Sequence, residues 1–512
     1  MEVQGRAVSA LTLLALAAAL AAAGVVVASQ PVRSPWWTYA DADATYTATG
    51  LNLLLGKRAK YLDHPGLPLE ELLEISFGAD WLAHGAPARQ RYVDARLLDL
   101  DRTRTVYRSW AAFFFLLGAA ASTLIAWRLF GSWWISAAGG LLWLGAPGLA
   151  AMSIQYRPDV ALTVLSLVDV YMIVRAARER STALYLLAAA VLGFATMVKM
   201  NAAVLAVPLA LALLLRRPVE TWRPRLRLRR LLLVGLPWLA LAVALNWSRF
   251  PFRPTAAQWV MLAAAIAVLV GAFALRRPLA TVVGAVVAGA LVPATLDVRD
   301  GLQSFVVTAR GLTGGGVNTD VSWFSTPLHR FVEYPLQQGL VLFALAVVAA
   351  AIGVVGRDPE PALLVVAAFV LGLSAYARLG DVHYFAPGFV VAVPAVLWLL
   401  RRLDARLAVP VAVALVAYVV VPQLRHRDDA RISTRAERAA AAPSIAAARR
   451  RVAAGEVALT PSYYPVAGTR WFELVQIYIV HAPRYPYRFL PDTERARRYA
   501  AERGLRVAAT IR

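Results

Sequence analysis

Long apolar runs of Ala, Leu and Val recur along almost the whole sequence. Each run has roughly 16 to 22 residues, the length that an α-helix needs to cross the hydrocarbon core of a bilayer. A helix also satisfies its own backbone hydrogen bonds, as lipid requires. The pattern predicts an all-α polytopic membrane protein with about thirteen transmembrane helices. The predicted spans are 7–28, 110–127, 133–153, 160–175, 183–198, 201–215, 231–247, 257–275, 279–296, 336–356, 361–377, 384–400 and 407–422.

Arginine clusters between the runs indicate the direction of the spans. With a cytoplasmic N-terminus, the clusters at 175–180, 216–230 and 401–406 all fall on the cytoplasmic side, as the positive-inside rule expects. The first run could also be a signal peptide. Its length, and the lack of a convincing cleavage site before Pro31, favour an uncleaved span. We predict a multi-pass protein of the cell (inner or plasma) membrane whose C-terminal tail is extracytoplasmic.

The same assignment divides the chain into a transmembrane module, residues 1–422, and a small extracytoplasmic domain, residues 423–512. The module has two long outer loops. The first, residues 29–109, is expected to contain amphipathic helices, and the second, residues 297–335, includes a glycine stretch that could close over a site or be a plain loop. The tail begins Arg/Ala-rich and continues with β-branched and aromatic residues, so it predicts a small α/β appendage with strands in EVALTPSYYPVAG and FELVQIYIVHAP.

Composition excludes several classes of function. The net charge is +22, but the basic residues border apolar runs and form no stripe with interleaved aromatics, so no nucleic-acid partner is expected. The chain has no cysteine, which rules out disulfides, thiolate chemistry and Cys-based metal sites. The sequence has no GxGxxG or Walker-type loop, so nucleotide binding has no support.

Acidic residues follow the first span directly, in WWTYADADATY. Asp41 or Asp43 could act as a general base. The alternative is that both only cap a helix that begins there and lies along the membrane surface. Further along the same loop, Asp63 and His64 precede Pro65 and Gly66, a turn sequence whatever the function.

Two short connections on the same side carry further charge. Arg157 and Asp159 lie in QYRPDV, and could either be a snorkelling Arg with an N-terminal Asp or contribute to a site. Lys199 lies at the tip of an apolar helical hairpin, and is one of three lysines, with Lys57 and Lys60. It could be a plain polar tip or a cation for a phosphate. A fourth cluster, YARLGDVHYFAPG, holds Arg378, Asp381, His383 and Tyr384.

These motifs together resemble the membrane-embedded GT-C glycosyltransferases, specifically the family 39-like group of protein O-mannosyltransferases and aminoarabinose transferases. The resemblance extends over roughly residues 5–400. It rests on five motifs, in the order DADATY, YLDHPGLP, RPD, VKMN and YFAPG. None of these motifs is specific alone. The resemblance implies a GT-C fold and an inverting transferase that moves a sugar from a polyprenyl-phosphate donor to a lipid, glycan or protein acceptor at the outer face of the membrane.

The resemblance also assigns roles to residues. The family's base maps to Asp41 or Asp43, with Asp41 narrowly preferred, although Asp-Ala-Asp replaces the common Asp-Glu pair. Lys199 maps to a phosphate-contacting lysine, with Arg157 and Arg378 as further phosphate-binding candidates. Substrate-positioning roles fall to Asp159, His64, Asp381, His383 and Tyr384. No cofactor and no metal are expected.

Two other classes of function compete with this hypothesis. A transporter or lipid flippase of the cell envelope would have charges in mid-span and an internal repeat. The chain has no evident repeat, and Asp169 is the one clear mid-span charge. A non-catalytic scaffold for envelope assembly would leave the outer carboxylates dispensable.

Overall fold

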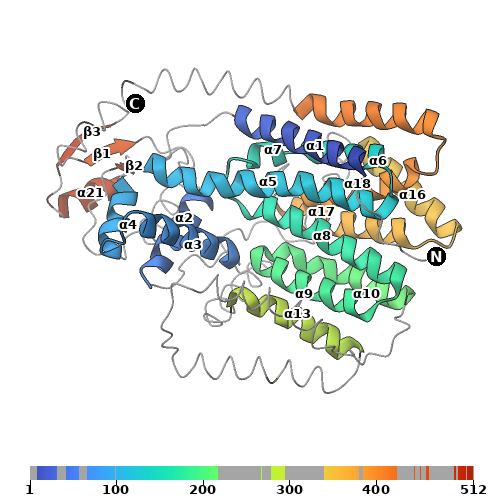
Figure 1. Cartoon of the computed structure of the whole chain (residues 1–512). Coiled ribbons are helices and arrows are strands. Elements are labelled where there is room, and N and C mark those ends of the chain that lie inside the picture. The colour runs from blue at the N-terminus through green and yellow to red at the C-terminus, as the bar shows by residue number, and fades with distance from the viewer. Residues whose placement is uncertain are drawn as a thin grey trace.

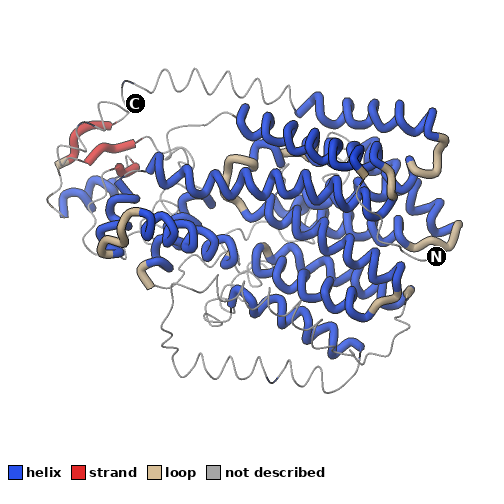
Figure 2. The backbone as a smooth tube through the Cα atoms, in the orientation of Figure 1, coloured by secondary structure: helices blue, strands red, loops and turns tan. Residues whose placement is uncertain are grey.

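The structure is a computed structural model of the chain. It describes residues 9–30, 42–56, 66–98, 100–216, 278–294, 340–379, 385–423, 457–460, 489–491, 494–502 and 507–510, with a few single residues between these ranges (Figure 2).

Most of the described residues form a bundle of apolar helices, as Figure 1 shows. The predicted spans are helical over most of their described residues, whereas the predicted spans 231–247 and 257–275 lie almost wholly outside the described ranges. Within the described ranges, four helical stretches are long and apolar enough to cross a bilayer: 10–29, 105–130, 158–179 and 405–423. The bundle helices are α1 (Ala10–Ser29), α5 (Leu100–Phe130), α6 (Trp133–Leu144), α8 (Pro158–Glu179), α9 (Thr182–Val198), α10 (Ala206–Leu215), α13 (Pro278–Ala294), α16 (Leu340–Val355), α17 (Glu360–Leu379), α18 (Ala386–Leu400) and the unlabelled helix 405–423.

Two boundaries differ from the sequence-based expectation. Helix α5 begins at Leu100, well before the predicted span start at 110, because LDRTRTVYRS continues the helix outside the apolar segment. The predicted span 133–153 is interrupted, because α6 ends at Leu144 and a turn through Pro147 separates it from the short helix α7 (Leu149–Met152). Hydropathy locates apolar segments, so it detects neither the polar extension nor the apolar turn.

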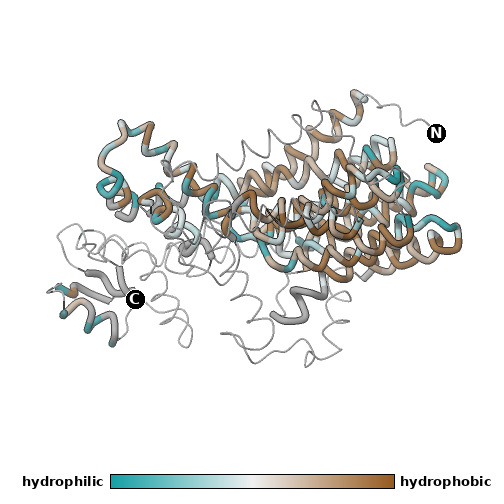
Figure 3. Tube along the Cα trace, turned by 90° about the horizontal axis from the view of Figure 1, so that it is seen from below, coloured by the Kyte–Doolittle hydropathy of each residue, from teal (hydrophilic) through white to brown (hydrophobic). Residues whose placement is uncertain are grey.

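The core of the bundle lies around α18, whose residues are almost all buried. Figure 3 shows the predominantly apolar colouring of the bundle. Large apolar side chains are exposed on α1, α13, α16 and the helix 405–423, as expected of surfaces in contact with lipid. Helices α9 and α13 approach each other closely: a Cβ on Gly193 would lie 1.9 Å from the Val286 carbonyl oxygen, and one on Gly289 would lie 1.8 Å from that of Ala190.

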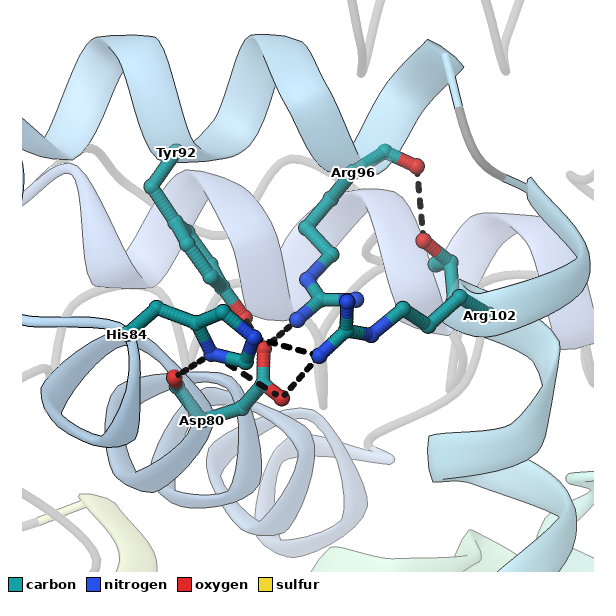
Figure 4. A network of polar contacts seen from close by, with 6 residues as sticks. Asp80, His84, Tyr92, Arg96 and Arg102 are labelled. Atoms are coloured by element: carbon teal, nitrogen blue, oxygen red, sulfur yellow. Dashed lines mark hydrogen bonds and ion pairs between the residues drawn. The ribbon is translucent and has the colours of Figure 1, made fainter.

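Three further helices lie at one end of the bundle: α2 (Ala42–Leu54), α3 (Leu67–Ala83) and α4 (Arg89–Leu98). We call this the α2–α4 end. Figure 4 shows that Asp80 of α3 accepts hydrogen bonds from Tyr92 Oη, at 2.5 Å, and from Arg96, both on α4. Arg102, near the start of α5, lies 3.8 Å from the same carboxylate. This cluster joins three successive helices, and burial raises the pKa of Tyr92, so its hydroxyl stays protonated as a donor.

The described part of 423–512 contains a parallel sheet of three short strands in the order β2-β1-β3. The strands are β1 (Val457–Thr460), β2 (Phe489–Pro491) and β3 (Val507–Thr510), and α21 (Glu494–Glu502) lies between the last two in sequence. Strand β1 falls within the first predicted strand segment, whereas the second, at 472–483, lies outside the described residues. That this appendage is extracytoplasmic stays a prediction.

Candidate functional site

A buried ion pair joins two of the residues singled out by the sequence. Lys199 Nζ donates to Asp159 Oδ1 at 2.5 Å, and the two residues are 5% and 3% exposed. They are 40 positions apart in sequence. The pair lies where α8 begins and α9 ends, so the hairpin geometry of these two helices brings the residues together.

The local sequence explains the position of Asp159. Pro158 occupies the first turn of α8, where its missing N–H costs no helical hydrogen bond. Asp159 follows in the same turn, where the helix dipole favours a negative charge. Arg157 is the N-cap residue of α8 in extended conformation, is half-buried, and lies two residues before Asp159 in the sequence.

Lys199 occupies a break between two helical segments. It caps the end of α9 with extended dihedrals (φ −156°, ψ 127°), and the short 3₁₀ helix η2 (Met200–Leu205) follows before α10. Its backbone N–H donates to the Ala195 carbonyl at 2.9 Å. The predicted hairpin tip is therefore a non-helical turn with an inward-directed ammonium, and not a solvated polar tip.

Burial of this pair carries an energetic cost. Removing two charges from water costs several kcal/mol per ion, on the order of what their attraction returns, so a buried ion pair is weak support for stability. The Lys199 ammonium is held next to a fixed counter-ion, the Asp159 carboxylate, so the site contains a cation in a defined position.

The α2–α4 end contacts the same turns. Tyr156 Oη donates to the Leu69 carbonyl of α3 at 2.7 Å, and the Gly66 N–H donates to the Val198 carbonyl at 3.2 Å. Helix α3 also carries three almost fully buried carboxylates, Glu70, Glu71 and Glu74. Sequence reasoning missed Tyr156 and the three glutamates.

The sequence contained a partial signal for these residues. Glu70 and Glu74 have the spacing of a polar helix face, which normally indicates a solvated surface. In the structure that face is buried. Tyr156 stands directly before the RPD motif, and only a long-range contact distinguishes it from an ordinary interfacial tyrosine.

The remaining predicted site residues are only partly placed. Asp43 is the second residue of α2 and Arg378 is near the end of α17, but the structure does not describe their side chains. The others lie outside the described residues: Asp41, His64, Asp381, His383 and Tyr384. Their roles stay predictions.

No metal centre is evident in the described ranges. Among these residues, no group of three or more His, Asp or Glu side chains is placed to share a metal ion. The expectation of a metal-free enzyme is untested by this observation.

Comparison with known proteins gives one sequence match and two structural ones. Residues 103–247, which hold both Lys199 and Asp159, match the family described as dolichyl-phosphate-mannose-protein mannosyltransferase. No curated protein sequence matches the chain.

Two solved structures are similar to the chain: ArnT from Cupriavidus metallidurans bound to undecaprenyl phosphate, and the same protein in the apo state. In both cases the identity is 17%, and the alignment covers 98% of this chain and 89% of the other. The TM-scores are 0.31 and 0.32.

Proposed function

We propose that the chain is a membrane-embedded glycosyltransferase with a specific reaction, because residues 103–247 match the dolichyl-phosphate-mannose-protein mannosyltransferase family and the motifs of the sequence resemble the same group. The chain transfers a sugar from a polyprenyl-phosphate donor to an envelope acceptor at the outer face of the membrane, with inversion at the anomeric carbon. The observation that carries this proposal is the buried Lys199–Asp159 pair inside the matched segment.

The chemistry needs two kinds of group. A carboxylate, Asp41 or Asp43, takes the proton from the acceptor hydroxyl while that oxygen attacks the anomeric carbon of the sugar. The bond between that carbon and the phosphate oxygen breaks, and polyprenyl phosphate leaves with the electron pair. Cations near the leaving oxygen stabilise the charge that develops on it.

Lys199 and Arg157 are the cations that we assign to the donor phosphate, with Arg378 as a third. Asp159 fixes the position of the Lys199 ammonium before the donor arrives, so that no reorganisation is required during the reaction. A charge that is already desolvated also interacts more strongly with the phosphate than a hydrated one. This reaction requires neither a nucleotide nor a cofactor.

The first test replaces members of the pair and measures sugar transfer from a polyprenyl-phosphate-linked donor in lipid nanodiscs. We expect Lys199→Gln to lower kcat/KM by about a hundredfold or more, the usual effect of losing one stabilising donor. Lys199→Gln alone leaves the Asp159 carboxylate buried without its cation, which can impair folding. The double variant Lys199→Gln with Asp159→Asn removes both charges and keeps hydrogen-bonding groups.

The matched control is Arg178→Gln. Arg178 makes a two-pronged ion pair with Glu360, at the opposite end of α8. We expect this variant to retain activity within about twofold, because surface ion pairs contribute little. If the double variant is well folded and transfers sugar at the wild-type rate, the phosphate assignment is wrong. Movement of donor across the bilayer without release of polyprenyl phosphate would instead indicate a flippase.

A second test addresses the base. Asp41→Asn and Asp43→Asn, made singly and together, separate the two candidates. We expect one single variant to lose transfer while it still binds donor, because the base acts on the acceptor and not on the donor phosphate. Full activity in the double variant would remove both residues from the mechanism.

A further inference from the structure

Tyr156 connects the α2–α4 end to the start of α8. Its side chain is 1% exposed, and its hydroxyl donates to the Leu69 carbonyl across 87 positions of sequence. Burial raises the pKa of this phenol, and the nearby Glu70 carboxylate raises it further. The hydroxyl is therefore a donor throughout the range of an enzyme assay.

A second contact connects the same end to the end of α9. Gly66, the N-cap residue of α3, has φ +50°, and its N–H donates to the Val198 carbonyl at 3.2 Å. The Tyr46 ring lies against this glycine so closely that a Cβ there would be 2.3 Å from Tyr46 Cε1. Tyr46 also packs edge-on to Tyr156, with ring centroids 6.2 Å apart.

These contacts and the ion pair form one continuous series of interactions. Tyr156 is hydrogen-bonded to Leu69, and Gly66 precedes Leu69 at the start of the same helix. Gly66 is bonded to Val198, the residue before Lys199. Lys199 is bonded to Asp159, three residues after Tyr156. The beginning of α3 thus holds both backbone segments that carry the charged pair.

We infer that Tyr156 is a positioning residue for the Lys199–Asp159 pair, because its hydroxyl fixes the turn before α8 against α3 and so sets where the two charges meet the donor phosphate. The inference rests on the proposed function, because the transfer reaction is the activity that Tyr156 would affect. It adds a residue whose hydroxyl is hydrogen-bonded to α3, and it makes α3 part of the site.

The test is Tyr156→Phe, which removes only the hydroxyl and keeps the ring that packs on Tyr46. The control is Tyr185→Phe. Tyr185 is also buried, and its hydroxyl donates to the carbonyls of Ala212 and Arg216 at 3.1 and 2.9 Å, next to the end of α10 far from the pair. Each variant loses the hydrogen bonding of a phenol to backbone carbonyl groups, so the two are expected to lower the melting temperature to a similar extent.

The transfer kinetics distinguish the two variants. We expect Tyr156→Phe to lower kcat by about five- to twentyfold at saturating donor, because small displacements of positioned groups are costly to the reaction. Tyr185→Phe should leave kcat within about twofold of wild type, because the bond it loses lies far from the reacting groups. Equal losses in both variants, or none in Tyr156→Phe, would overturn the inference.

A double-mutant cycle separates this inference from the proposed function. If Tyr156 acts through the pair, Tyr156→Phe costs much less in the background of Lys199→Gln with Asp159→Asn than in wild type. Additive effects would refute the positioning role while leaving the proposed function intact. If Lys199 variants themselves retain full transfer, the proposed function fails first, and any kinetic effect of Tyr156→Phe then has another origin.

Discussion

Gly193 lies at the close contact between α9 and α13. Adding a single methyl group there, as in Gly193→Ala, should strongly destabilise the bundle. An alanine Cβ there would lie 1.9 Å from the Val286 carbonyl oxygen and 2.9 Å from the Ala290 nitrogen. Both obstacles are backbone atoms, so no rotamer change relieves the overlap. Because ordinary carbon–oxygen contacts are about 3.4 Å, the two helices would have to separate locally by roughly 1.5 Å.

The energetic cost follows from that separation. A gap of even 0.5 to 1 Å forfeits roughly a quarter to a half of each dispersion contact across an interface. With the strain of overpacking, typically about 1 to 3 kcal/mol, we expect Gly193→Ala to destabilise the bundle by about 3 kcal/mol. Gly289→Ala should cost about as much, because its Cβ meets the Ala190 carbonyl oxygen at 1.8 Å.

The two substitutions should not be additive. Once the helices have separated for one methyl group, the second meets less resistance, so the double variant should cost at least about 1 kcal/mol less than the sum. Gly24→Ala in α1 is the matched control, because a Cβ there has no neighbour within 4 Å. We expect that variant to be neutral, or more stable by up to about 1 kcal/mol.

Thermal unfolding in one detergent, at one scan rate, compares the four variants under equal conditions, because membrane proteins often unfold irreversibly. Gly193 lies in α9, six residues before Lys199 in the sequence, so transfer activity should fall along with stability. A wild-type melting curve for Gly193→Ala, or fully additive losses, would refute the reasoning from the close contact.

Three other substitutions test separate features. Asp80→Asn removes the carboxylate that faces Arg96, whose side chain is 4% exposed, so we expect a loss of about 2 to 3 kcal/mol, measured as faster proteolysis between α3 and α4. Wild-type proteolysis would mean that the cluster is dispensable. Gly66→Ala introduces strain at φ +50° and an overlap with Tyr46, so we expect at least about 1 kcal/mol of destabilisation in thermal unfolding. Arg402→Leu removes a cation 3.8 Å from the Trp398 ring centroid, but the side chain is half exposed, so the melting temperature should shift by less than about 2 °C.

Much of the bundle could be predicted because the local sequence of each span is sufficient to indicate a helix. An apolar run of sufficient length must be helical in lipid, whatever surrounds it. The runs that became α8 and α9 were therefore predicted to within a few residues. The extent of α5 was not, because its polar first turns are determined by packing against α4 and not by hydropathy.

The site was predictable to a smaller degree. The rarity of lysine and the position of RPD drew attention to Lys199 and Asp159, but sequence placed them only on the same side of the membrane. Their 2.5 Å contact depends on how two helices meet. Tyr156 and the buried glutamates of α3 were out of reach, because their burial depends on contacts between distant segments.

The length of α5 has a consequence for how the protein experiences its membrane. A 31-residue helix is about 46 Å long, whereas the hydrocarbon layer measures about 30 Å. Helices adapt to a thinner or thicker bilayer by tilting. A tilt of 10° would displace one end of a helix of this length by about 8 Å relative to the other end. The Asp80 cluster attaches α3 and α4 to the first residues of α5. A change in the tilt of α5 would therefore also displace α3. We expect the position of the Lys199–Asp159 pair to depend on bilayer thickness for this reason.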